Sequence, residues 1–260
     1  EQVRGDGVGT AMALAAAFEK IKPGHRVDIA SSGFTDAHRA RYQFLPTIDR
    51  IKPTLPQLHD LTIRVNLQSA KMQELRYDVK DNHLEIHLTP AQGQLSGDHV
   101  SSALSGFKYD LIITIGCPDL PALGALYSDH AAFFQSAPII NMDCAPENAR
   151  YGHINIVDIA AVACGEIGAC FLREVAPQHL NADIATCLLA GIIAETRSFR
   201  HPRMTPRTFE ITSALLTANA RREEILKHLM QTRSIGQLKL WGRALSRLRV
   251  DADRRLVWTL

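Results

Sequence analysis

The chain has 260 residues, enough to bury a full hydrophobic core in one large domain or two smaller ones. Its 46% hydrophobic and 22% charged residues are typical of a soluble globular protein, and the absence of a run of about 18 apolar residues excludes a membrane span. The net charge of +2 requires neither a nucleic acid nor a membrane as a partner.

Charge is unevenly distributed along the chain. Residues 221–260 contain ten Lys/Arg and four Asp/Glu, a net charge of +6, which leaves −4 on the other 220 residues. Both a solvated helix face and a tail that binds nucleic acid or a protein partner fit this pattern. The five cysteines are odd in number and include no C-x-x-C pair, so we expect reduced thiols and a cytoplasmic protein.

Three alternate glycines within residues 5–9 precede an Ala-rich apolar run. Because glycine permits tight turns, we expect a glycine loop that opens into a helix over about residues 9–21, which the Pro-Gly pair at 23–24 ends. A helix N-terminus suits a phosphate, but Asp6 would repel that phosphate unless a metal lay between them.

Apolar runs bounded by turn residues predict buried strands that alternate with helices. We expect strands at 26–31, 109–115, 137–142 and 154–157, helices at 120–127, 160–175, 182–195 and 205–230, and a final strand pair at 245–250 and 255–259. Alternating segments on either side of Asp81-Asn82 predict a β-hairpin. The pattern predicts an α/β fold with a parallel sheet, whose ligands lie at the carboxyl ends of the strands.

Polar residues at the ends of these elements are therefore the candidate site residues. They are Asp6, then Asp119 in Gly116-Cys117-Pro118-Asp119, then Asp143-Cys144-Ala145, and Glu195 with the residues up to Phe199. In this order they resemble the DHH superfamily of phosphoesterases, which includes RecJ-like exonucleases and nanoRNase/pAp phosphatases. The most specific matches are residues 140–148 and residues 188–208.

The resemblance implies a domain organisation. Residues 1–203 would form a DHH-type α/β domain with helices on both faces of a parallel sheet and a hairpin inserted at about 61–90. Residues 204–235 would form a helical linker. Residues 236–260 would begin a C-terminal substrate domain that is cut short.

The resemblance also implies an activity. Members of the family hydrolyse phosphodiester or phosphomonoester bonds in short oligonucleotides or nucleotides, with two Mn²⁺ or Mg²⁺ ions that stabilise the attacking and leaving oxygens. The implied partners are a nucleotide or short RNA or DNA, and not a membrane. A homodimer is left open.

This sequence departs from the family pattern at the metal ligands. Arg4 replaces the first residue of the Asp-x-Asp loop, Gly116 replaces a metal-bridging Asp, and Cys144 and Ala145 replace the two histidines that follow Asp143. A weak residual site of Asp6, Cys144 and Glu195 remains. Thiolate prefers softer ions such as Zn²⁺.

A metal-free site is the alternative. In that case Arg4 pairs with Asp6, Asp143 or Glu195 in place of the ions. We expect Asp143 to accept backbone hydrogen bonds at its strand end. Cys164 and Cys170, six apart on a predicted helix, are expected to be core residues.

Two functional hypotheses follow. The first is a phosphoesterase of the DHH type, impaired by the loss of ligands. The second is a non-catalytic descendant that binds a nucleotide, RNA or a protein partner, with Arg197 and Arg200 as candidate phosphate-binding residues. A dinucleotide-binding domain is disfavoured because the glycine spacing is G-x-G-x-G and Asp6 would face the pyrophosphate.

Overall fold

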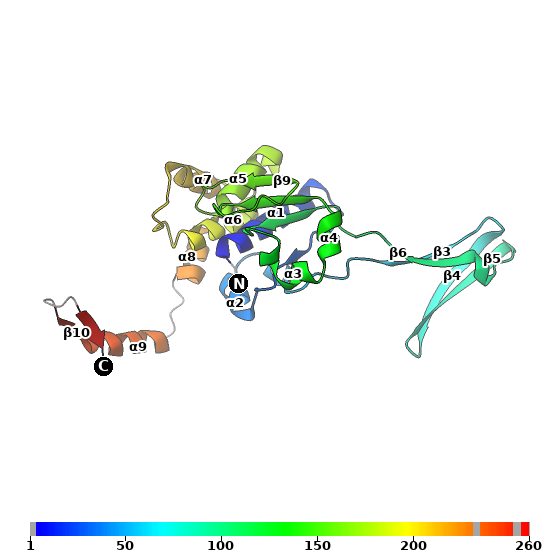
Figure 1. Ribbon diagram of the computed structural model, residues 1–260, viewed down its shortest axis with the longest axis horizontal. Coiled ribbons are helices and arrows are strands. Elements are labelled where there is room, and N and C mark those ends of the chain that lie inside the picture. The colour runs from blue at the N-terminus through cyan, green and yellow to red at the C-terminus, as the bar shows by residue number, and fades with distance from the viewer. Residues whose placement is uncertain (1–3, 231–234, 252–255, 260) are drawn as a thin grey trace.

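The computed structural model describes residues 4–230, 235–251 and 256–259. Residues 231–234 of the predicted linker, and residues 252–255 and 260 of the predicted start of a C-terminal domain (236–260), lie outside the described residues. Figure 1 shows a body of helices and strands from which the β3–β6 segment projects, with α9 and β10 lying apart from the body.

A parallel sheet organises the body. It consists of β7 (Ile112–Ile115), β8 (Ile139–Asp143) and β9 (Ile154–Val157), in that order. Parallel neighbours end at the same edge, so the segments that follow these strands meet there. A short parallel pair, β1 (Ile29–Ala30) with β2 (Ile51–Lys52), adds to the body. The prediction of an α/β fold with parallel strands is confirmed, although the strand expected at 26–31 is reduced to two residues.

Three helices pack together beside this sheet: α1 (Gly5–Ile21), α5 (Cys164–Val175) and α6 (Ala182–Glu195). In α6 every residue from Ile184 to Ile193 is buried, as expected for a helix surrounded by other elements. Within the described residues, we find no helix that combines the length and apolarity needed to cross a membrane.

The predicted glycine loop is wrong. The helix begins at Gly5, so the glycines belong to its first turns. Gly5 and Gly9 are four residues apart and share one helix face. A Cβ on Gly9 would collide with backbone atoms of α6 and lie 2.8 Å from Gly191 N, and a Cβ on Gly5 would lie 2.7 Å from Ala194 Cβ. These glycines therefore allow α1 and α6 to cross closely.

Two further helices, α7 (Pro206–Thr217) and α8 (Arg222–Met230), place Ile211, Leu215 and Ile225 in the same hydrophobic core. Thr205 caps α7 and Pro206 occupies its first turn, as the sequence predicts. A single helix over 205–230 is wrong, because a turn at residues 218–221 separates α7 from α8.

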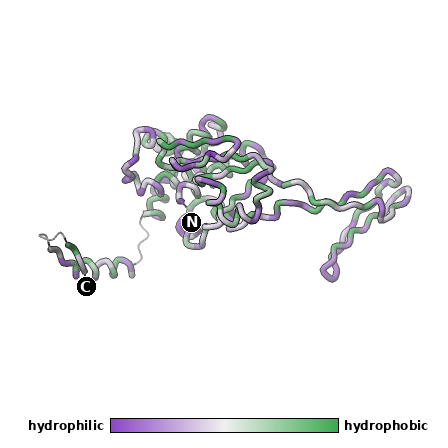
Figure 2. The backbone as a smooth tube through the Cα atoms, in the orientation of Figure 1, coloured by the Kyte–Doolittle hydropathy of each residue, from purple (hydrophilic) through white to green (hydrophobic). Residues whose placement is uncertain are grey.

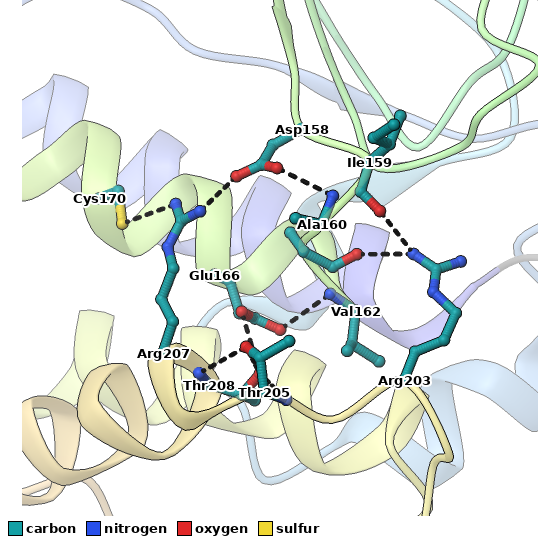
Figure 3. A network of polar contacts seen from close by, with 11 residues as sticks. Asp158, Ile159, Ala160, Val162, Glu166, Cys170, Arg203, Thr205, Arg207 and Thr208 are labelled. Atoms are coloured by element: carbon teal, nitrogen blue, oxygen red, sulfur yellow. Dashed lines mark hydrogen bonds and ion pairs between the residues drawn. The ribbon is translucent and has the colours of Figure 1, made fainter.

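Polar contacts attach the start of α7 to the segment between β9 and α5 (Figure 3). Buried Glu166 accepts hydrogen bonds from Val162 N (3.0 Å) and Thr208 Oγ1 (3.2 Å). Arg207 pairs with Asp158, and Arg203 donates to the carbonyls of residues 159 and 161. Burial raises the pKa of Glu166.

A second, smaller core lies under other helices. Phe133 and Phe134 of α4 (Ala131–Ser136) pack with Ile139 of β8 and with Leu58. The helix predicted at 120–127 is wrong: a 3₁₀ turn (Pro121–Leu123) and α3 (Ala125–Ser128) replace it, and Gly124 has a φ of +60° between them. Neither α4 nor α2 (Asp36–Tyr42) was predicted.

The projecting segment contains two antiparallel pairs: β3 (Leu61–Val65) with β6 (Val100–Leu104), and β4 (Ala70–Lys80) with β5 (His83–Gly93). In Figure 2 hydrophilic and hydrophobic residues alternate along these strands, whereas hydrophobic residues are densest in the body. The apolar cross-strand pair Tyr77–Ile86 is exposed.

The C-terminal described residues form α9 (Ile235–Ser246) and an antiparallel pair, β10 (Leu248–Asp251) with β11 (Leu256–Thr259). The predicted pair therefore forms, but its first strand begins three residues later than expected because α9 continues to Ser246. The start expected at Arg255 lies outside the described residues.

The helix crossing gives a test of the glycines. We expect Gly9→Ala to lower the free energy of unfolding by about 1–3 kcal/mol, since its methyl group would overlap the α6 backbone. Gly7→Ala is the matched control, because its Cβ would meet only Ile115 O at 3.8 Å. Alanine favours a helix by about 1 kcal/mol over glycine, so Gly7→Ala should be neutral or stabilising. Urea unfolding compares the two, and equal effects would contradict the close crossing.

Candidate functional site

The edge where β7, β8 and β9 end holds a buried cluster of three side chains. Ligand atoms of Asp6, Cys144 and Cys164 all lie within 4.8 Å of one another. Asp6 comes from the first turn of α1, Cys144 directly follows β8, and Cys164 begins α5. Their exposed fractions are 0%, 5% and 0%. The fold thus brings three distant segments to one closed point.

Backbone N–H groups hold the Asp6 carboxylate. Oδ1 accepts from Gly7 N at 2.8 Å, and Oδ2 accepts from Cys164 N at 3.0 Å. The second bond caps α5 from another helix, since Ala163 at the N-cap provides no side-chain acceptor. Asp6 therefore has a structural partner on each oxygen.

Asp143 is held in the same way. Its Oδ1 accepts from the N–H groups of Cys144 (2.8 Å) and Ala145 (3.2 Å), and its Oδ2 accepts from Asn148 Nδ2 (2.8 Å). Asn148 also receives a hydrogen bond from Asn141 Nδ2 at 2.7 Å. The predicted role of Asp143, accepting backbone hydrogen bonds at a strand end, is confirmed.

Arg4 lies near these groups without a direct ion pair. Partial burial disfavours its charged form, but attraction to Asp6, Glu195, Cys144 and Asp143 outweighs this and raises the pKa of Arg4. Over the part of the chain that the structure describes, no carboxylate approaches Arg4 within the 4.0 Å of an ion pair. Arg4 is therefore attracted to these groups over a longer distance and does not form the direct ion pair that the sequence analysis offered as an alternative to metal ions.

Glu195 ends α6 beside the cluster but is not one of the three clustered side chains. Burial and repulsion by Asp6 raise the pKa of Glu195, whereas Arg4 and Arg197 work to lower it. Both cations thus act on the same carboxyl group. The residual set of Asp6, Cys144 and Glu195 stays a prediction, although the structure groups Cys164, not Glu195, with the first two.

The other predicted motif positions are separate or carry no ligand atom. Gly116 has a φ of +62°, and a Cβ there would lie 3.5 Å from Cys164 Sγ. Ala145 offers only its backbone, and exposed Asp119 accepts a hydrogen bond from Ala122 N at 2.8 Å. Exposed Arg200 follows α6, and among the described residues its guanidinium forms no hydrogen bond or ion pair.

Sequence reasoning missed Cys164. The predicted helix began at residue 160, which would place Cys164 on its second turn among core residues. The helix actually begins at Cys164, so this residue lies at the strand-end edge. Correct placement of the helix start was the one observation that could have found it.

Comparisons with known proteins give the relationship. No family model matches the chain. It is 31% identical over 108 residues to the bifunctional oligoribonuclease and PAP phosphatase NrnA of Thermus thermophilus, covering 42% of this chain and 33% of the relative. It is 29% identical over 109 residues to a probable bifunctional oligoribonuclease and PAP phosphatase NrnA of Streptococcus mutans, covering 41% and 32%. The matched segments thus span about a third of these relatives.

A solved structure agrees with the fold. An exopolyphosphatase-related protein from Bacteroides fragilis superposes with a TM-score of 0.50 at 20% identity, covering 56% of this chain and 43% of that chain. Over the matched segments the chain is thus similar in sequence to members of the DHH superfamily of phosphoesterases.

Phosphoesterases of this superfamily are generally metal-dependent, so the donor atoms must be tested against a pair of hard ions. Mn²⁺ and Mg²⁺ prefer about six oxygen ligands each. The cluster offers one carboxylate, already bonded to two N–H groups, and two thiols. The cation of Arg4 adds repulsion. These residues do not fit a two-metal Mn²⁺ or Mg²⁺ centre.

Buried Asp143 should matter for stability. Asp143→Ala leaves two backbone N–H groups at the strand end without an acceptor, so we expect a loss of about 2–4 kcal/mol in the free energy of unfolding. Asp119→Ala, at an exposed turn, should cost at most about 1 kcal/mol. Urea denaturation measures both, and a comparable loss in the two variants would show that the Asp143 network contributes little.

Removal of the charge of Arg4 should change the pKa of Glu195. Because Arg4 lowers the pKa of Glu195, Arg4→Met should shift it upward, and a ¹³C NMR titration of the carboxyl group measures the shift. A carboxyl group whose pKa is raised by folding contributes to the free energy of unfolding. That contribution is fully present below the ordinary pKa of 4.5 and is lost as the pH rises through the pKa of the folded state.

Arg4→Met should therefore lose more stability above pH 4.5 than the wild type does. Arg173→Met, which removes an exposed α5 cation near Glu174, is the control and should leave Glu195 unchanged. An unshifted Glu195 in Arg4→Met would refute the proposed coupling.

Proposed function

We propose that this protein binds the phosphate ester of a nucleotide or short oligonucleotide, and that it does not hydrolyse that ester through two metal ions. It would be a non-catalytic, phosphate-recognising relative of the DHH phosphoesterases. The observation that carries the proposal is the position and charge of Arg4, a partly buried guanidinium near the strand-end edge where metal ligands would be required.

Arg4 has the chemistry of a phosphate ligand. Its guanidinium stays charged and offers paired N–H donors that match phosphate oxygens. No carboxylate lies within ion-pair distance of Arg4 among the described residues, so no internal ion pair competes with an incoming anion for its donors. Arg197, which acts on the same carboxyl group from the end of α6, is the second candidate cation.

The three neighbouring carboxyl groups should repel an incoming anion only weakly. Asp6 and Asp143 are fully buried, and their charges are balanced by backbone N–H groups. Glu195 has a raised pKa, so a bound phosphate would further favour its protonated form. The site would then present a net positive charge to the ligand, from Arg4 and Arg197.

The ligand class follows from the relatives. The matched Thermus and Streptococcus proteins are named as a bifunctional oligoribonuclease and PAP phosphatase and as a probable one. A chain that keeps this fold and replaces a metal ligand by arginine exchanges metal-mediated contacts for a direct guanidinium–phosphate contact.

Binding and turnover can be measured separately. Isothermal titration with adenosine 3′,5′-bisphosphate and with a short RNA in EDTA should show binding, and Mn²⁺ should produce no hydrolysis of either. Arg4→Ala should weaken binding at least tenfold, because a charge-assisted hydrogen bond is worth about 1.5–3 kcal/mol. Arg173→Ala should bind as the wild type does.

Two results would overturn the proposal. The first is Mn²⁺-dependent hydrolysis that Asp6→Asn and Glu195→Gln both abolish, which would restore the two-metal phosphoesterase. The second is the absence of binding to the bisphosphate and to RNA, which would leave a protein partner as the ligand of this fold.

A further inference from the structure

We infer that Asp6, Cys144 and Cys164 form a closed site for one thiophilic divalent cation of the Zn²⁺ class. This inference goes beyond phosphate recognition and does not depend on it. It rests on the ligand atoms of this chain, which differ from those of the family. The two sulfur atoms that do not suit a pair of Mn²⁺ or Mg²⁺ ions are the ligands that one softer ion prefers.

Geometry brings the donors close to the required separation. Zinc bonds of about 2.0–2.3 Å place the ligand atoms of a tetrahedral site roughly 3.5–4 Å apart. The carboxylate oxygen and the two sulfur atoms already lie within 4.8 Å of one another. Small side-chain adjustments, on the order of 1 Å, would thus bring all three onto one ion.

The charges also balance. Binding the ion would release one proton from each thiol, so one carboxylate and two thiolates would carry −3, and a divalent cation would leave −1 at a buried point. Arg4, which is attracted to Asp6 and Cys144, supplies the remaining positive charge. A buried charge without such compensation would be costly, which gives Arg4 a role even where it contacts no ligand atom.

Surrounding groups orient the three ligands. Gly7 N and Cys164 N fix the Asp6 carboxylate, and Asp143 fixes the backbone at Cys144. Gly116 leaves space beside Cys164 Sγ. The Val162 carbonyl oxygen accepts a hydrogen bond from Cys144 Sγ at 3.9 Å and lies at the edge of the same space.

The burial of the three ligands indicates a structural metal site. All three residues are at most 5% exposed, so a bound ion would lack the open position of a catalytic zinc. The ion would instead tie the start of α1, the end of β8 and the start of α5 together. We expect it to stabilise the fold.

The test uses the full chain, stripped of metal and kept reduced with a phosphine. Calorimetric titration with Zn²⁺ should show one site per chain, and Co²⁺ should produce a thiolate-to-cobalt charge-transfer band. Cys164→Ser and Cys144→Ser should each weaken Zn²⁺ binding at least about 100-fold, the upper range for loss of a supporting group. Mn²⁺ and Mg²⁺ should not compete.

Cys117→Ser is the matched control. Cys117 is a buried thiol that also follows a strand of the sheet, yet it donates to Asp119 O at 2.9 Å and lies outside the cluster. This variant should bind Zn²⁺ as the wild type does, and Zn²⁺ should raise its Tm equally.

Several outcomes would overturn the inference: no Zn²⁺ binding by the reduced wild type, a Co²⁺ spectrum without thiolate charge transfer, or equal losses in Cys117→Ser and Cys164→Ser. The wild-type Co²⁺ spectrum decides the matter even if a serine variant fails to fold. Phosphate binding is measured in EDTA, so its failure is distinguishable from failure of the metal site.

Discussion

The hydrogen bond from Cys164 N to the carboxylate of Asp6 joins residues 158 positions apart, and the arrangement of the body depends on it. It places a negative charge at the N-terminus of α5, where the helix dipole favours one. Gly191 packs against the backbone of Asp6, with 3.1 Å between the site of its absent Cβ and Asp6 Cα, so α6 is fixed relative to the same residue. Asp6 thus contacts two helices: its side chain caps α5, and its backbone packs against α6.

The hydrogen bonds of Asp6 give this motif residue a structural role. Asp6 occupies a motif position, and each of its carboxylate oxygens accepts a hydrogen bond from a backbone N–H group, which gives it a structural role whether or not it also binds an ion. Asp143 shows the same commitment. Motif residues can therefore persist because the fold needs them, and their presence alone is weak evidence for hydrolysis.

How far the sequence predicts this protein depends on the type of interaction. Apolar runs located β9 and α6 to the residue; in α6, burial on all sides leaves a continuous apolar pattern. The starts of α1 and α5 were misplaced, because glycine at residues 5–9 and the apolar residues at 160–163 gave no local indication of where backbone hydrogen bonds begin. Those starts are set by tertiary contacts: the crossing with α6 and the cap from Asp6. Cys164 was consequently missed, while Asp6, Cys144 and Arg4 were found from the order of the motifs.

The crossing of α1 with α6 also bears on the order in which the chain can fold. Residues 5–9 must wait for residues 187–194, so most of the body is synthesised before the N-terminal helix has a surface to pack against. Contacts of such long sequence separation slow folding, and an unpacked apolar helix invites association with other chains. The close approach that packs the native core therefore depends on contacts that can form only late in synthesis.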